Sequence, residues 1–93
     1  MKIIINVTSS AYDSPYGGEQ ELEVKTGEYR LDEVFRLHFF RIIIDDIIDG
    51  AVCFRLMEGA LPHYFVLESV GETASFRRET SIGYDEFTFT LTD

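Results

Sequence analysis

The sequence predicts a small, mainly β protein: an antiparallel two-sheet sandwich or a partly open barrel of six to seven strands. Three observations lead to this prediction. Apolar and polar residues alternate in several short segments, turn-forming residues separate these segments, and Asp49-Gly50 joins two strongly apolar stretches. Asp-Gly favours a tight hairpin turn in which both central residues have positive φ.

The hairpin around Asp49-Gly50 predicts a shared apolar face, because side chains alternate along a strand. In the simplest register its members are Ile43, Ile47, Val52, Phe54 and Leu56. Asp45 falls on the same face, so we expect a β-bulge or a turn near Asp45-Asp46 that moves this charge to solvent. The same register places Cys53 opposite Asp46 and allows a diagonal salt bridge between Arg55 and Asp46.

Five further segments have the composition and alternation of strands: 2–8, 19–26, 63–70, 73–80 and 86–92. In the first, Ile3, Ile5 and Val7 point to one side, and in the last, Phe87, Phe89 and Leu91 do the same. The segment 63–70 is apolar on both sides, which is typical of a central strand covered on both faces.

The segment 31–39 fits two patterns. Helical spacing relates Leu31, Val34, Phe35 and His38, whereas strand spacing relates Phe35, Leu37 and Phe39. We expect at most one short helix, and it would lie here. If this helix forms, the alternative fold is α+β with a β-grasp-like order of elements.

Length and composition predict one domain, residues 1–93, with enough apolar residues for one core. The chain is 45% hydrophobic and contains eight Phe and five Tyr. Its one cysteine, Cys53, cannot form an internal disulfide, which fits a reducing compartment. No segment has the length of a signal peptide core or a membrane span. We therefore expect a cytoplasmic protein that does not bind membranes.

The charge balance is strongly acidic: 17 acidic residues oppose eight basic ones, for a formal net charge of −9. Such a surface repels nucleic-acid phosphates and anionic lipids, so direct nucleic-acid binding is not expected. A basic protein is the natural complement if a charged partner exists. The same charge is also explained by solubility alone.

Two groups of residues could carry metal or acid–base chemistry. The acidic group is Asp45, Asp46 and Asp49, which Ile47 and Ile48 interrupt, unlike a calcium loop with its alternating oxygen ligands. The histidines His38 and His63 are far apart, and a site built on them would need carboxylates such as Asp45 or Glu68. The sequence contains neither a nucleophile elbow nor a phosphate-binding loop. We predict no enzyme, no catalytic residue, no metal and no cofactor.

The candidate partner-binding residues are Glu19, Glu21, Glu23, Tyr12 and Tyr16. Residues two apart in a strand repeat at about 6.8 Å, twice the roughly 3.4 Å rise per phosphate of one DNA strand. A rigid row of glutamates could therefore imitate phosphates in a basic groove. An ordinary solvated strand that protects a sheet edge would have the same pattern. Tyrosines in the preceding loop would add interface contacts.

The run from Phe39 to Ile44 is apolar except for Arg41, so both of its sides need cover. A central strand provides that cover within one chain, and a homodimer provides it between two. These observations favour a non-catalytic acidic protein-interaction module, in its sharper form an inhibitor or immunity-type protein that blocks a basic nucleic-acid-binding partner. The alternatives are a self-assembling structural subunit of a phage or bacterial particle, and a small bacterial protein with a metal or small-molecule site.

Overall fold

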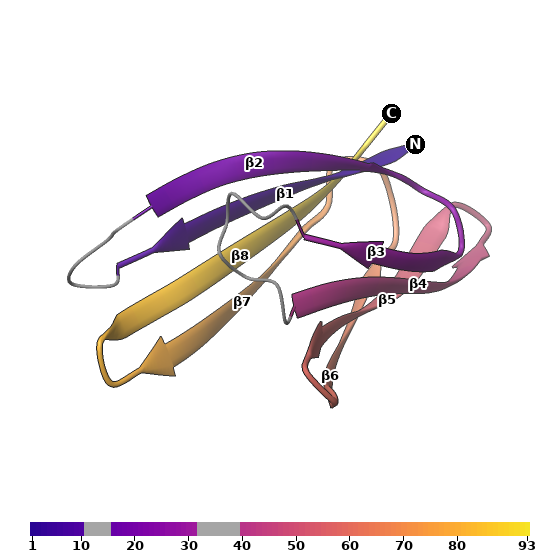
Figure 1. The fold of residues 1–93 in the computed structure, drawn as a ribbon. Helices are drawn as coiled ribbons and strands as arrows, with labels where there is room; N and C mark the ends of the chain where they lie inside the picture. The colour runs from indigo at the N-terminus through magenta and orange to yellow at the C-terminus, as the bar shows by residue number, and fades with distance from the viewer. Residues whose placement is uncertain (11–15, 32–39) are drawn as a thin grey trace.

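The computed structural model describes residues 1–10, 16–31 and 40–93, which form eight β-strands and no helix. The strands are β1 (Lys2–Ser9), β2 (Tyr16–Glu23), β3 (Gly27–Arg30), β4 (Phe40–Ile48), β5 (Ala51–Glu58), β6 (Leu61–Leu67), β7 (Thr73–Thr80) and β8 (Gly83–Thr92). They form two antiparallel sheets, sheet A in the order β2-β1-β8-β7 and sheet B in the order β3-β4-β5-β6 (Figure 1). The predicted two-sheet sandwich is confirmed.

The strand count exceeds the predicted six to seven because the short segment Gly27–Arg30 pairs with β4 at the edge of sheet B. The helix expected near 31–39 falls almost wholly on residues 32–39, which lie outside the described residues. The β-grasp-like alternative is wrong for the described strands, since they divide into two separate four-stranded sheets.

The core lies between the two sheets and consists of inward-facing side chains from both. Its fully buried members include Ile3, Ile5, Phe40, Ile42, Phe54, Leu56, Phe87, Phe89 and Leu91. The prediction that alternate residues of the first and last strands point into the core is therefore confirmed. Rings from opposite sheets meet here, with Phe54 and Phe89 centroids 5.1 Å apart and Phe40 and Phe87 centroids 4.9 Å apart. Each such side chain contributes about 1.5–3 kcal/mol through burial.

The β4–β5 hairpin turns at Asp49 and Gly50, whose φ values of 52° and 83° are both positive, as predicted. A register shift between Ile44 and Asp46 is the expected bulge, and Asp45 is exposed there. Cys53 lies opposite Asp46, also as predicted.

The bulge corrects the predicted hairpin face. The bulge adds one residue to β4. The side chains before it therefore point to the opposite face from the one that the simple register predicts. Ile42 and Ile44 consequently point into the core, while Ile43 faces outward beside Arg55. The bulge also brings Asp45, instead of Asp46, to Arg55: the guanidinium Nη2 lies 2.7 Å from Asp45 Oδ1.

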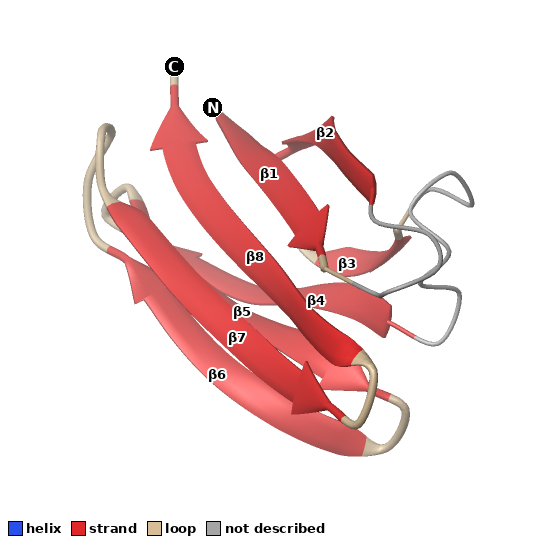
Figure 2. Ribbon diagram, turned by 90° about the vertical axis from the view of Figure 1, so that its left-hand side faces the viewer, coloured by secondary structure: helices blue, strands red, loops and turns tan. Residues whose placement is uncertain are grey.

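β6 is an edge strand of sheet B, so the prediction of a central strand at 63–70 is wrong. Its inward side chains pack on the core, and its outward side chains Tyr64 and Val66 are 74% and 53% exposed. After Leu67 the chain turns and enters β7 of the other sheet (Figure 2). Apolar residues on both sides of β6 therefore do not reflect two covering layers within the described chain.

The strands nearest the two ends of the chain are neighbours in sheet A. β1 pairs antiparallel with β8 along its whole length, from Lys2 opposite Thr92 to Ser9 opposite Asp85. The two termini consequently lie close together (Figure 1).

Candidate functional site

The glutamate row lies on β2, the edge strand of sheet A. Glu19, Glu21 and Glu23 are exposed, as their alternation predicted, and lie opposite Asn6, Ile4 and Lys2 of β1. Lys2 Nζ lies 3.6 Å from Glu21 Oε2, and both side chains are about half exposed. Within the described residues, Glu19 and Glu23 have no ion-pair partner. The row is thus rigidly spaced and only partly neutralised.

The outer face of sheet A is mostly polar, with Ile4 of β1 as an apolar member opposite Glu21 and Thr90. At the β7 edge, Arg77 lies 3.2 Å from Glu79 and 3.5 Å from Glu86, and its guanidinium stacks 3.7 Å from the centre of the Tyr84 ring. The uncharged polar side chains of this face come from β1, β8 and β7: Asn6, Thr8, Thr73, Ser75, Thr88, Thr90 and Thr92. The charged groups that these four strands place on the outer face are five glutamates (Glu19, Glu21, Glu23, Glu79 and Glu86) and two bases (Lys2 and Arg77).

Of the two candidate tyrosines, Tyr16 lies in the described part of the chain, on the same strand as the glutamates. Tyr12 lies outside the described residues. Tyr16 is the first residue of β2 and pairs with Ser9 of β1. Their role in partner binding stays a prediction.

A cluster of charged side chains joins the two sheets, and its members were not all predicted. Arg78 of β7 lies between Glu58 of β5, at 3.1 Å, and Asp85 of β8, at 3.6 Å. His63 Nε2 lies 3.2 Å from the second oxygen of Glu58, and its ring lies 4.2 Å from that of Phe76. The arginine bridges carboxylates of both sheets, so the cluster ties the layers together at this end.

The sequence contains an indication of this cluster: two charged residues occupy strand positions that point inward. Asp85 shares the inward phase of Phe87 and Phe89, and Arg78 shares that of Phe76. A charge in an inward phase needs a partner of opposite sign, because burying an unpaired charge is costly. The identity of that partner depends on how the two sheets pack, and the residues next to the charge in the sequence do not reveal it.

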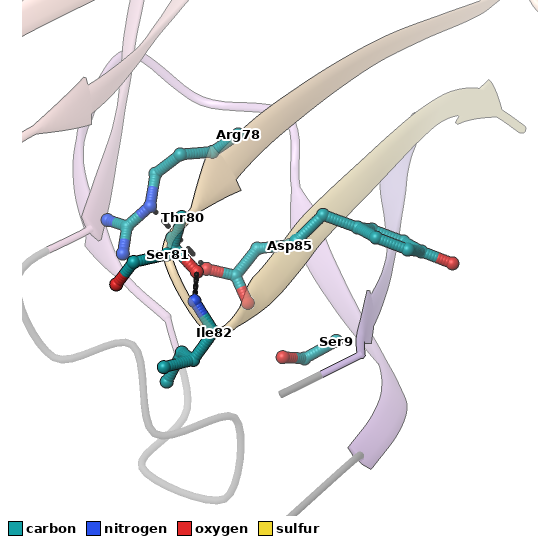
Figure 3. Close-up of a pocket in the computed structure, with 7 residues that line it drawn as sticks. Ser9, Arg78, Thr80, Ser81, Ile82 and Asp85 are labelled. Atoms are coloured by element: carbon teal, nitrogen blue, oxygen red, sulfur yellow. Dashed lines mark hydrogen bonds and ion pairs between the residues drawn. The ribbon is translucent and has the colours of Figure 1, made fainter. Parts of the chain in front are cut away.

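A pocket of about 250 Å³ lies beside this cluster at the β7–β8 turn (Figure 3). Its lining includes Ser9, Arg78, Thr80 and Asp85. Thr80 Oγ1 donates to the Gly83 carbonyl at 3.0 Å, and Asp85 is only 8% exposed. Because two carboxylates already surround the Arg78 guanidinium, an anionic ligand would have to compete with both.

The predicted acidic and histidine candidates do not converge. Asp45 and Asp46 lie on the outer side of sheet B at the bulge, whereas His63 lies on the inner side with Glu58 and Phe76. The hydrogen bonds to Asp45 raise the pKa of Arg55 above its usual value. His38 lies outside the described residues. Among the residues that the structure describes, no three His, Cys, Asp or Glu side chains are grouped to hold a metal ion.

Comparisons with protein-family models, with curated proteins and with solved structures found no match for this chain. In the described parts of the chain, none of the elements is a helix with the length and hydropathy needed to cross a membrane.

Proposed function

We propose that this protein is a non-catalytic, acidic protein-interaction module that binds a basic partner through the outer face of sheet A. The observation that carries the proposal is the excess of glutamates on that face, five against Lys2 and Arg77. Both bases are already paired with glutamates of the same face. A partner with exposed lysines or arginines would therefore meet uncompensated negative charge.

The spacing of the row supports a sharper form of this proposal. Glu19, Glu21 and Glu23 repeat along β2 at about 6.8 Å, a multiple of the roughly 3.4 Å phosphate rise of one DNA strand. The hydroxyl groups beside the row are further hydrogen-bonding groups for a basic groove. An inhibitor or immunity-type protein that occupies the nucleic-acid site of its partner would use this chemistry.

The cluster around Arg78 supports a structural role for the buried polar residues. Its cation contacts two carboxylates, and its histidine contacts a carboxylate and a ring. These groups are engaged with one another across the sheets, as expected of residues that fix the packing of two layers.

The test is capture of basic proteins from a native lysate on the immobilised protein, with elution by salt or by short duplex DNA. We expect the wild type to retain proteins that both agents displace, since the interaction is electrostatic and DNA competes for the same groove. The variant Glu19→Gln/Glu21→Gln/Glu23→Gln should lose them.

The matched control is Asp49→Asn/Glu68→Gln/Asp93→Asn, which removes the same charge at exposed positions away from the row. If both variants lost the captured proteins equally, net charge alone would explain the binding, and the glutamate row would have no specific role. Retention that neither salt nor DNA changes would contradict the proposal.

A further inference from the structure

The two outer faces of the sandwich differ in chemistry. The outer face of sheet A is polar apart from Ile4 and the Tyr84 ring, as expected for an antiparallel sheet with one solvated side. The outer face of sheet B instead has an apolar centre. Its apolar members are Ile43, Cys53, Met57, Pro62, Tyr64 and Val66.

The exposure of this apolar centre is greatest on β6. Tyr64 is 74% exposed and Val66 is 53% exposed, although both occupy strand positions next to half-buried neighbours of β5. Ile43, Cys53 and Arg55 are each half-buried. Arg55 lies among these apolar residues, opposite Ile43 on one side and Tyr64 on the other, and its charge is paired with Asp45. Such an area has the composition of a protein interface, in which tyrosine, methionine and arginine are enriched.

The charges on this face are separated along the strands. Arg30 and Arg41 lie directly opposite each other at one end. Asp45 and Asp46 lie at the other end, beside the hairpin turn. Glu28 neutralises Arg41 at 2.8 Å, whereas Arg30 has no ion-pair partner in the described parts of the chain. Like charges directly opposite are unfavourable in a sheet, so this end of the face would gain from external carboxylates.

We propose that the outer face of sheet B binds a second copy of this chain, face to face, about a two-fold axis that runs across the strands in the plane of the interface. This axis reverses the strand direction, so it brings the Arg30 end of each copy onto the Asp46 end of the other. It also places the row Ile43, Arg55 and Tyr64 near the axis, against the same residues of the second copy. Each Arg55 there is already paired with Asp45 of its own chain. An axis along the strands would instead bring the arginine ends of both copies together, and likewise their aspartate ends.

The size of the face sets the strength of the contact. The four strands have 4, 9, 8 and 7 residues. With strands about 4.8 Å apart and a rise of about 3.4 Å per residue, they give a flat area of about 450 Å². Both copies together would then bury about 900 Å², in the range of weak, transient interfaces. The dimer is therefore weak and concentration-dependent, and it is independent of the glutamate face on the opposite side of the sandwich.

The first test is sedimentation of the purified protein from about 1 µM to about 1 mM. We expect a monomer–dimer equilibrium that Tyr64→Lys/Val66→Lys weakens by at least about tenfold, since it places charge in the apolar centre. The matched control is Thr73→Lys/Ser75→Lys, which makes the same change on β7, the edge strand of sheet A. Thermal unfolding verifies that both variants fold.

The second test uses the charge pattern. Arg30→Glu and Asp46→Lys should each weaken the homodimer, because each creates like-charge contacts in both symmetry-related positions. Mixing the two variants should restore a heterodimer, since all four positions then pair opposite charges. A wild type that stays monomeric at all concentrations would overturn the proposal. So would a dimer that the β6 substitutions leave unchanged, or a mixture with no recovery.

Discussion

Replacing Arg78 by methionine tests whether the charged cluster ties the two sheets together. The substitution removes the guanidinium that lies between Glu58 and Asp85 but keeps an apolar stem of similar length. The side chains of Glu58 and Arg78 are 25% exposed, and that of Asp85 is 11% exposed. Both carboxylates would remain in place with their cation gone.

The expected loss lies between two limits. Removing one partner of a fully buried pair costs about 3–5 kcal/mol, and an exposed pair contributes about 0–1 kcal/mol. For side chains that are mostly buried we expect a loss of about 2–3 kcal/mol in the free energy of unfolding. In a domain of this size the midpoint of thermal unfolding should fall by about 8–24 °C.

The matched control is the neighbouring Arg77→Met. Arg77 lies on the same strand but faces outward, and its side chain is 48% exposed. Its two exposed ion pairs and its contact with Tyr84 predict a loss below about 1 kcal/mol. The assay is urea unfolding of both variants followed by circular dichroism. Adding Asp85→Asn to Arg78→Met should recover part of the loss, because it removes one uncompensated carboxylate.

Equal losses for Arg77→Met and Arg78→Met would refute this reasoning. That result would mean that the inward position of Arg78 confers no advantage over an outward one. An Arg78→Met variant as stable as the wild type would likewise show that the contacts with Glu58 and Asp85 do not stabilise the sandwich.

Two further substitutions test the packing of the sandwich. Gly83→Ala should destabilise the protein by about 1–3 kcal/mol, because φ is +146° there and an added Cβ would lie 2.6 Å from the Ser10 carbonyl oxygen; an unchanged urea midpoint would contradict this. Phe89→Ala should cost about 3–5 kcal/mol by leaving a cavity beside Phe54. Thr90→Ala, on the outer face of the same strand, should cost far less when both variants are unfolded in urea.

The local features of the fold could be predicted from the sequence. Alternation identified the inward residues of β1 and β8, and Asp49-Gly50 identified the hairpin turn. The unfavourable position of Asp45 predicted a bulge. These features depend on neighbouring residues, so a single sequence contains the information.

The features that were missed depend on contacts between distant segments. The bulge itself has a local cause. That Ile43 faces outward, however, depends on the register with which β4 pairs with β5. The edge position of β6 depends on the strand order of sheet B. Glu58 and Arg78 meet only because the two sheets pack at that end. Spacing along the chain does not encode these relationships.

The pairing of β1 with β8 has a consequence for how the protein folds. β8 lies between β1 and β7, so it completes sheet A by joining strands separated by most of the chain. Closing so long a loop costs entropy before the contacts form, and chains with such a high contact order fold in milliseconds to seconds. Until β8 is in place, β1 would present an unpaired backbone edge, which makes the partly folded chain prone to aggregate.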